Sequence, residues 1–446
     1  MMKRFGQFDH ARINQATCCG MLCLLGLAPM FAEHAGAAGL QAGAARVEIT
    51  TPADALPYGA ASSSPGNEKP FVGMHDPVFA RALVLSDGAT EVAFVLVDVT
   101  AIPVPHEMSK AVANELGVAE DHLMLAAEHT HSVPLLNYHR DPADKAEVAE
   151  VERVEKGAVE AAREAKANLQ PARVSFGRGQ AFVNVNNGEV AGQAGDADPA
   201  LPSDKTLDIV RFAGADGTAI AVLMDYPDHA DVMLHSVTKD GGYEISGDMP
   251  GVAAGLLEDH IQGKPVVLFA RGAGGDQLPL FRSVQPAGAL GTTDEAAGGW
   301  ALLDAQARRL AGSALSVIEK MPAGTADVKI SAAAKTVPCP AQARRNQPGD
   351  APLPPVQIPL SLIRINDIAL AGVGGDVGTE IGEKFKAASP VKDSTMITMT
   401  SGSVGYILAD SSYTHPGHGL MGSPIKAGCA EKAIVEGLLS MMGNEK

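Results

Sequence analysis

The sequence predicts an α/β fold in which mixed or stacked β-sheets are flanked by helices. Two patterns carry this prediction: strand-like apolar runs alternate with helix-like segments, and several neighbouring strands lie close enough along the chain to pair as hairpins. The composition agrees, because 46% hydrophobic and 20% charged residues in a chain of 446 are ordinary for a globular protein. A chain of this length can bury one large core or two smaller ones.

The expected elements follow from apolar periodicity and from the turn or cap residues at their ends. Strands are predicted at 46–50, 92–98, 122–127, 208–212, 219–224, 266–270, 358–365, 368–373 and 396–399. Helices are predicted at 106–116, 144–169, 251–260, 301–320, 380–387 and 430–442.

Local residues support individual elements. The continuous apolar run 92–98 suits a strand that is buried on both faces. Gly117 suits the C-terminal cap of the helix before it, and the turn 214–217 joins two strands into a hairpin. The segment 144–169 is strongly charged and carries valines near one face, so we expect its charges to face solvent. Residues 340–356 are rich in Pro, Gln and Arg, which predicts a linker or surface loop.

The N-terminus has the layout of a secretory signal peptide. Three basic residues stand among the first twelve, an apolar stretch covers 16–32, and Ala-rich sequence follows at 35–45. We expect a signal peptide at residues 1–40, cleaved between residues 32 and 45, and a secreted or periplasmic protein. The alternative is an unstructured leader before a later start codon. Pro29 interrupts the apolar stretch, which is also too short for a membrane span.

The five cysteines agree with export. Cys18, Cys19 and Cys23 lie in the expected leader, so the mature chain keeps only Cys339 and Cys429. An even pair in an oxidising compartment permits one disulfide, although two separate buried thiols fit the sequence equally well. Because the sequence contains no Cys-x-x-Cys motif, a thiolate zinc site is excluded.

The charge pattern limits the classes of partner. The formal net charge is −17, and the acidic residues are spread along the chain rather than gathered in a tail. No run of Lys and Arg occurs in the sequence. We therefore expect neither nucleic acid nor an anionic membrane as a partner.

His129 and His131 are the first candidates for chemistry. They stand two residues apart at the end of a predicted strand, where alternating side chains would put both rings on one face. Two such imidazoles can bind a metal together, or one can ligate while the other contacts the substrate. The carboxyl edge of strands is also where α/β proteins place their sites.

Further polar residues follow other predicted strands. His229 comes directly after the strand 219–224, and His235 competes with it for a ligand role. Asp248 has the simpler interpretation of an N-cap, with Pro250 in the first turn of the helix.

Two glycine-rich turns follow later strands. The turn 271–276 ends in Asp276 and lacks the Lys and Ser/Thr of a P-loop, which favours a backbone packed against an active site. The turn 373–378 contains Asp376, either a cap for the following helix or a metal-binding carboxylate. The sequence contains neither a Gly-x-Ser-x-Gly elbow nor a His-Glu-x-x-His motif, which argues against serine catalysis and helix-borne zincin chemistry.

Taken in order, these segments resemble the neutral, non-lysosomal ceramidase family over nearly the whole mature chain. The matching segments are 73–82, Glu128-His129-Thr130-His131-Ser132-Val133-Pro134, Ser246-Gly247-Asp248-Met249-Pro250-Gly251, 375–382 and Gly405-Tyr406-Ile407. The resemblance implies one catalytic domain at 46–446 without the C-terminal β-sandwich domain of long ceramidases.

The resemblance also implies a set of site residues. One zinc ion per chain would be held by His129, His229, Asp376 and Tyr406, with Asp376 standing where the family has glutamate. His131 would contact the reacting carbonyl, and His131 and Tyr406 would stabilise the oxyanion. Asp276 is a further catalytic candidate, since it or Asp98 could orient a ligand histidine.

Other departures from the family concern the substrate. Val133 stands where the family has glycine, and Leu278 stands where it has serine. The family's arginine near the oxyanion has its loose counterpart around 184–187, where this chain has asparagines and valine.

The resemblance implies an exported zinc-dependent amidohydrolase that cleaves an N-acyl amide of a ceramide-like lipid in sphingolipid metabolism. Zinc-bound water would attack the amide carbonyl. Two alternatives stay open: a zinc hydrolase of a different ester, lactone or small amide, and a non-catalytic periplasmic binding protein. The partner expected in the first two cases is a small molecule or lipid, with no membrane span after cleavage.

Overall fold

The computed structural model describes residues 39–60, 69–136, 143–187, 201–234, 236–239, 241–283, 296–342, 353–414 and 422–443. The expected signal peptide lies outside these ranges except for its last two residues, and His235 also lies outside them. No helix in the described part of the chain is long and apolar enough to cross a membrane.

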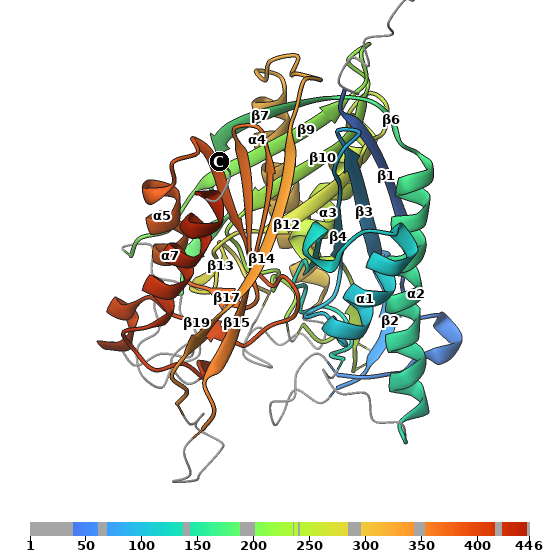
Figure 1. The fold of residues 1–446 in the computed structure, drawn as a ribbon. Helices are drawn as coiled ribbons and strands as arrows, with labels where there is room; N and C mark the ends of the chain where they lie inside the picture. The colour runs from blue at the N-terminus through green and yellow to red at the C-terminus, as the bar shows by residue number, and fades with distance from the viewer. Residues whose placement is uncertain are drawn as a thin grey trace, which may run out of the picture. The chain divides into compact units, whose positions relative to one another are not determined.

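Three large sheets form the frame of the structure (Figure 1). The first has the order β5-β4-β3-β1-β6, with β5 Leu123–Ala127, β4 Glu91–Val97, β3 Phe79–Ser86, β1 Gln41–Glu48 and β6 Gln170–Pro171. The second has the order β12-β10-β9-β7, with β12 Val266–Arg271, β10 Ala219–Tyr226, β9 Thr206–Ala213 and β7 Arg173–Gln180. The third has the order β14-β15-β16-β18, with β14 Ile330–Cys339, β15 Val356–Ile365, β16 Ile368–Val373 and β18 Asp393–Ile397.

Helices and short ladders complete the frame. The helices are α1 Pro105–Leu116, α2 Lys145–Ala167, α3 Asp248–His260, α4 Ala296–Ile318, α5 Thr379–Ala388 and α7 Ala430–Met442, with 3-10 turns at Ala53–Ala55, Glu120–His122 and Asp410–Thr414. The two-stranded ladders are β2 Phe71–Met74 with β11 Tyr243–Ile245, β8 Asn184–Asn186 with β13 Gln277–Pro279, and β17 Asp376–Val377 with β19 Tyr406–Ile407.

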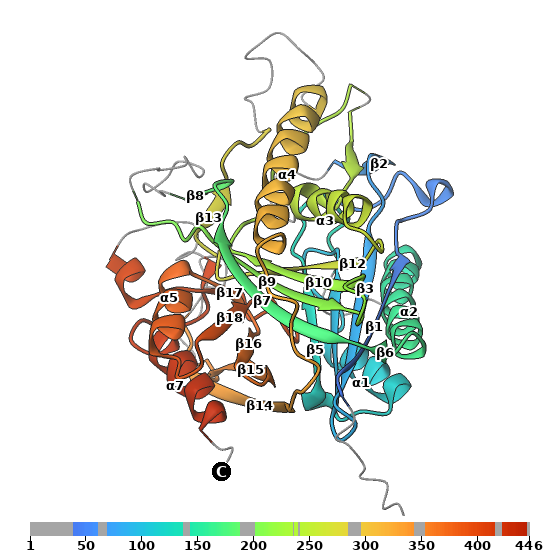
Figure 2. The same ribbon diagram turned by 90° about the horizontal axis from the view of Figure 1, so that it is seen from above.

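The three sheets share one inner core, and each has a pair of helices on its other face. Buried side chains from all three sheets pack together inside, including Leu83, Phe94, Phe212, Leu268, Ile363 and Leu370. Helices α1 and α2 cover the first sheet, α3 and α4 the second, and α5 and α7 the third (Figure 2). Strands that are buried on both faces are continuously apolar, which is why β4 is a run of hydrophobic residues.

Each sheet contains one parallel pair of strands. These pairs are β4 with β5, β10 with β12, and β16 with β18, whereas the other neighbours in the three sheets are antiparallel. The mixed sheets and flanking helices confirm the predicted fold class. Parallel neighbours end at the same edge, so the loops that follow them can meet in one place.

Three of the longer strands, at 79–86, 173–180 and 330–339, were not predicted from the sequence, and neither were the short strands of two to four residues. Strand β14 shows why, because it contains Ala332–Ala334, and alanine is depleted in strands. Its ten residues pair with ten residues of β15, so tertiary pairing overrides the local preference.

The prediction that the charged residues of helix α2 face solvent is wrong for two glutamates. Glu147 and Glu150 are both buried. Glu150 accepts hydrogen bonds from Thr51 Oγ1 at 2.9 Å and from Arg153 Nη1 at 2.8 Å. The pattern of charges along the helix does not mark Glu150 as buried, since its partner Thr51 is brought in by folding.

A disulfide joins Cys339, at the end of β14, to Cys429, just before α7. Of the two possibilities that the sequence allowed, the structure has the bonded pair. The bridge closes a sequence separation of 90 residues, which restricts the unfolded chain and so stabilises the fold.

Asp225, in β10, gives a pH-dependent prediction for stability. Its carboxylate is buried beside Asp208 and accepts a hydrogen bond from Thr395. Burial, reinforced by Asp208, raises the pKa of Asp225 well above its ordinary value. Its stabilising contribution is therefore greatest below the unfolded pKa of about 3.9 and is lost as pH rises toward the folded pKa.

We expect Asp225→Asn to raise the free energy of unfolding at pH 8 by about 1 kcal/mol or more, since one pKa unit corresponds to about 1.4 kcal/mol. The gain should shrink toward pH 4. Urea denaturation at several pH values measures it, with the exposed Asp367→Asn as control. A gain that does not depend on pH would contradict the prediction.

Candidate metal centre

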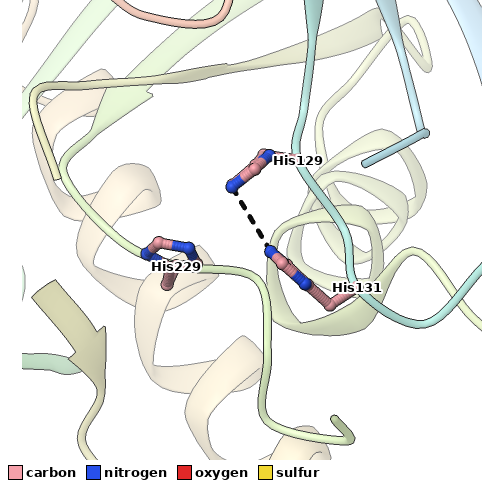
Figure 3. Close-up of side chains that lie close together, drawn as sticks. All are labelled: His129, His131 and His229. Carbon is pink, nitrogen blue, oxygen red and sulfur yellow. Dashed lines mark hydrogen bonds between the residues drawn. The ribbon is translucent and has the colours of Figure 1, made fainter. Parts of the chain in front are cut away.

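Three histidines from two loops converge beyond the carboxyl ends of β5 and β10. His129 and His131 follow β5, and His229 follows β10. Their ring nitrogens, one from each residue, lie within 4.8 Å of one another, a grouping that could hold a metal ion (Figure 3).

The convergence of His129 and His131 does not arise from strand alternation, as the sequence had suggested. Strand β5 ends at Ala127, and His129 has a φ of +77°, in the left-handed region that is uncommon for residues other than glycine. The two rings meet edge to face, with centroids 4.7 Å apart. A turn of the backbone therefore brings them together, and strained backbone of this kind is often found at functional sites.

His129 is buried and oriented by the backbone. Its Nδ1 donates to the carbonyl of Thr100 at 2.5 Å, which leaves Nε2 as the acceptor of the neutral ring. Nε2 lies 3.3 Å from Nε2 of His131 and 3.7 Å from Oδ2 of Asp376. A carbonyl on the outer nitrogen is a common arrangement for a metal-binding histidine.

His229 has a different outer contact. Arg271 Nη2 donates to its Nδ1 at 3.0 Å, and its Nε2 lies 3.7 Å from Oδ2 of Asp376. A guanidinium can only donate, so the neutral ring of His229 carries its proton on Nε2. Nε2 can bind a metal as part of a neutral ring only if this proton moves to Nδ1, which releases the bond from Arg271.

The environment keeps the two buried imidazoles neutral. Burial, with a smaller contribution from the positive charge of Arg271, lowers the pKa of His129 to about 4, although Asp376 opposes this shift. Burial also lowers the pKa of His229 well below its ordinary value, again helped by Arg271. Neutral imidazole is the form that binds metals.

Three of the separations between donor atoms are close to those expected around a small divalent ion. Four ligands in a tetrahedron around zinc, at about 2.0–2.2 Å, lie roughly 3.3–3.6 Å from one another. The distances of 3.3 Å between His129 and His131, and of 3.7 Å from Asp376 to His129 and to His229, are close to this range. Nitrogen and carboxylate donors are also those that zinc prefers.

His131 differs from the other two histidines in exposure. It is half-buried, whereas His129 and His229 are buried. It borders a small pocket whose other lining residues are Phe71, Ser132, Met233, Ser236, Tyr243, Glu244 and Trp300. Its distance to His129 suits a third histidine ligand, and its place beside the pocket suits the predicted contact with substrate.

Asp376 begins β17, and only Gly374 and Gly375 separate it from the end of β16 in the third sheet. The N-cap of α5 is Gly378, so Asp376 is not the cap of that helix, which was one of its two interpretations. Its Oδ1 accepts from Arg271 Nη1 at 2.5 Å, and its Oδ2 faces the histidines. The carboxylate thus has the position that a ligand requires.

Tyr406 lies next to Asp376 in the ladder formed by β17 and β19, where the two residues are direct partners. Its ring packs beside Gly422, at which a Cβ atom would come within 2.6 Å of Cδ2. Its predicted roles as metal ligand and oxyanion donor stay predictions.

The carboxylates of Asp276 and Asp98 accept hydrogen bonds from groups other than the outer ring nitrogens of the histidines. Asp276 Oδ1 accepts from the backbone and the hydroxyl of Thr379, at 3.0 and 2.6 Å. Asp98 accepts from Arg81 Nη1 at 2.7 and 2.8 Å. A catalytic role for Asp276 stays a prediction.

The interpretation of Asp248 as the N-cap of α3 is wrong. The N-cap of α3 is Gly247, and Asp248 has a φ of +51°. Its carboxylate accepts from the backbone of Val232 and Met233, at 3.0 and 2.9 Å, and from Ser132 Oγ at 3.2 Å. Asp248 therefore ties together the two segments that follow His131 and His229.

Sequence reasoning missed the two residues that hold the outer nitrogens. Thr100 acts through its carbonyl, which any residue provides, so no sequence signal marks it. Arg271 had been noted only as the first residue of a glycine-rich turn. A charged residue at the end of the apolar run 266–270 was the available signal.

Comparisons with known proteins identify the family and similar folds. Residues 41–282, more than half of the chain, match the family described as neutral/alkaline non-lysosomal ceramidase, N-terminal. The fold is similar to that of neutral ceramidase from Pseudomonas aeruginosa (18% identity, TM-score 0.70) and to a structure described as ceramidase complexed with C2 (17% identity, TM-score 0.70). Both comparisons cover 90% of this chain and 74% of the other. A search among curated proteins finds no match.

The cluster predicts the metal content of the purified protein. We expect about one divalent metal ion per chain, and little in His129→Ala or His229→Ala, because each change removes a buried donor. Elemental analysis after gel filtration measures this. The exposed His260→Ala serves as control and should keep the metal content of the parent. Full metal content in both site variants would contradict the assignment.

Proposed function

The chain belongs to the neutral/alkaline non-lysosomal ceramidase family, as its sequence motifs predicted, and we propose that it is an exported zinc-dependent amidohydrolase. The proposed substrate is an N-acyl amide, with a ceramide-like lipid as its best representative. The family supports a ceramidase-like hydrolase that acts on amides, whereas zinc, export and the identity of the lipid are the proposal.

One observation carries this proposal. Three imidazoles and the carboxylate of Asp376 meet at one point, although they come from loops of three different sheets. Two of the imidazoles are buried and have lowered pKa values, so they are uncharged at neutral pH, the form that binds a metal. A fold seldom gathers neutral histidines around a carboxylate without a functional reason.

The chemistry divides between the metal and the chain. When bound, zinc supplies a Lewis acid that activates water for attack on an amide carbonyl. His129, His229 and Asp376 would hold the ion, with Tyr406 as the further ligand that the family implies. His131 borders the pocket and can present a ring nitrogen to the developing oxyanion, or a proton to the leaving amine.

The small pocket beside His131 combines apolar and polar lining residues. Trp300 lines it, stacks on His75 with ring centroids 3.7 Å apart, and donates from Nε1 to Glu244 at 3.1 Å. Aromatic surface with a few oriented polar groups is typical of small-molecule sites.

Export is supported by two independent features. The first 45 residues have the layout of a signal peptide, and Cys339 and Cys429 form a disulfide, which is typical of oxidising compartments. N-terminal sequencing of the protein from the periplasmic or secreted fraction tests this proposal. A cytosolic protein with an intact leader would contradict it.

The substrate class can be measured directly. Zinc-loaded protein should release free fatty acid from short- and long-chain N-acyl amides, lose this activity on treatment with a chelator, and regain it with zinc. The same assay includes esters and lactones. Hydrolysis of these compounds without any amide hydrolysis would replace the proposed substrate with one of them, and no hydrolysis of any would favour a binding protein.

The role proposed for His131 can be tested separately from that of the metal ligands. We expect His131→Ala to lower kcat by roughly 10²–10⁴-fold, as expected for lost acid-base or oxyanion assistance, while the zinc content stays near that of the parent. His260→Ala is the control for both measurements. Loss of zinc together with activity would instead make His131 a third histidine ligand.

A further inference from the structure

Arg271 is a fully buried cation at the edge of the histidine cluster. It ends β12, and its side chain has no exposed surface. An isolated guanidinium would be very costly there, because burial removes its hydration. The fold must therefore give it both a negative partner and enough hydrogen-bond acceptors.

The contacts of Arg271 meet both requirements. Nε donates to the carbonyl of Asp228 at 2.7 Å, and Nη2 donates to the carbonyl of Gly274 at 2.9 Å and to Nδ1 of His229 at 3.0 Å. Nη1 donates to Oδ1 of Asp376 at 2.5 Å. Among these acceptors only Asp376 carries a negative charge, so it neutralises the guanidinium.

This arrangement gives the two oxygens of Asp376 different partners. Oδ1 belongs to Arg271, while Oδ2 lies 3.7 Å from Nε2 of both His129 and His229. Gly275 packs against the same carboxylate, and a Cβ atom there would lie 2.8 Å from Oδ1. The carboxylate is therefore restricted from turning both oxygens toward the histidines.

We propose that Arg271 is a positioning residue of this metal site, which makes Asp376 a one-oxygen ligand. The inference rests on the proposed function, since it needs a metal at the cluster. The planar guanidinium is suited to the task, because the bonds of Nε and Nη2 to the carbonyls of Asp228 and Gly274 fix the direction in which Nη1 donates to Asp376.

A crystal structure of the zinc-loaded protein tests the geometry without any substitution. We expect Asp376 to bind zinc through Oδ2 alone, with Oδ1 still within hydrogen-bond distance of Arg271 Nη1. Zinc bound by both oxygens of Asp376, or an Arg271 turned away from Asp376, would overturn the proposal.

Arg271→Lys tests the contribution of the planar guanidinium, because lysine keeps the positive charge but donates from a single nitrogen. We expect zinc affinity, measured by competition with a chelator, to fall by about 10- to 100-fold, as is usual when a partner of a ligand is lost. In the cobalt-substituted Arg271→Lys variant, Asp376 is free to bind the metal through both oxygens, which raises the coordination number. The visible absorption of the variant should therefore be weaker than that of the cobalt-substituted parent.

Arg81→Lys is the matched control. Arg81 is also buried, and its Nη1 also bonds a carboxylate, that of Asp98, which is not part of the histidine cluster. We expect this variant to keep the zinc affinity and the cobalt spectrum of the parent, even if its folding stability falls. A purely structural role for Arg271 would make the two variants alike in both measurements.

The outcomes separate this inference from the proposed function. A parent protein that binds no zinc overturns both. A parent that binds zinc and hydrolyses amides, with Arg271→Lys unchanged in zinc affinity and cobalt spectrum, overturns the role of Arg271 alone. If Arg271→Lys does not fold, the crystal structure of the zinc-loaded parent decides.

Discussion

The buried ion pair of Arg271 and Asp376 is the contact on which the geometry of the histidine cluster depends. It joins the end of a strand in the second sheet to the loop that follows β16 in the third. A buried pair stabilises a fold only if every other polar atom of the two groups is also satisfied. The carbonyls of Asp228 and Gly274 do this for Arg271, and they lie in the loops that carry His229 and Asp276. The charge that organises the site is thus supported by backbone from the same loops.

A single segment after β18 connects the three sheets at this point. Thr398 N donates to the carbonyl of Arg271, and Met399 N donates to that of Gly375. Ser401 N donates to the carbonyl of Leu125 in β5. Met399 and Ser401 have φ values of 58° and 55°, unusual for such residues, so local backbone preference is overridden to make these contacts. The strands are regular, and the irregular backbone is concentrated where they meet.

Much of the frame and part of the site were predictable from the sequence. The apolar runs at 92–98 and 266–270 correspond to β4 and β12, because continuous burial leaves a continuous apolar pattern. His129 and His229 were identifiable because each is a polar residue directly after such a run. Glu150 was not identifiable as buried, since its partner Thr51 is 99 residues away. Asp248 was read as a local cap because short-range chemistry is all that a single sequence displays.

The sequence by itself determined the fold class, the family and the residues able to donate to a metal. These depend on periodicity and on side-chain type, which are written in the order of the residues. Only the tertiary structure decided which donors meet, that Thr100 and Arg271 hold the outer nitrogens, and that the two oxygens of Asp376 have different partners. The physical reason is that these are distances between loops of three sheets, and loop positions follow from how the sheets pack, which leaves no local pattern in the sequence.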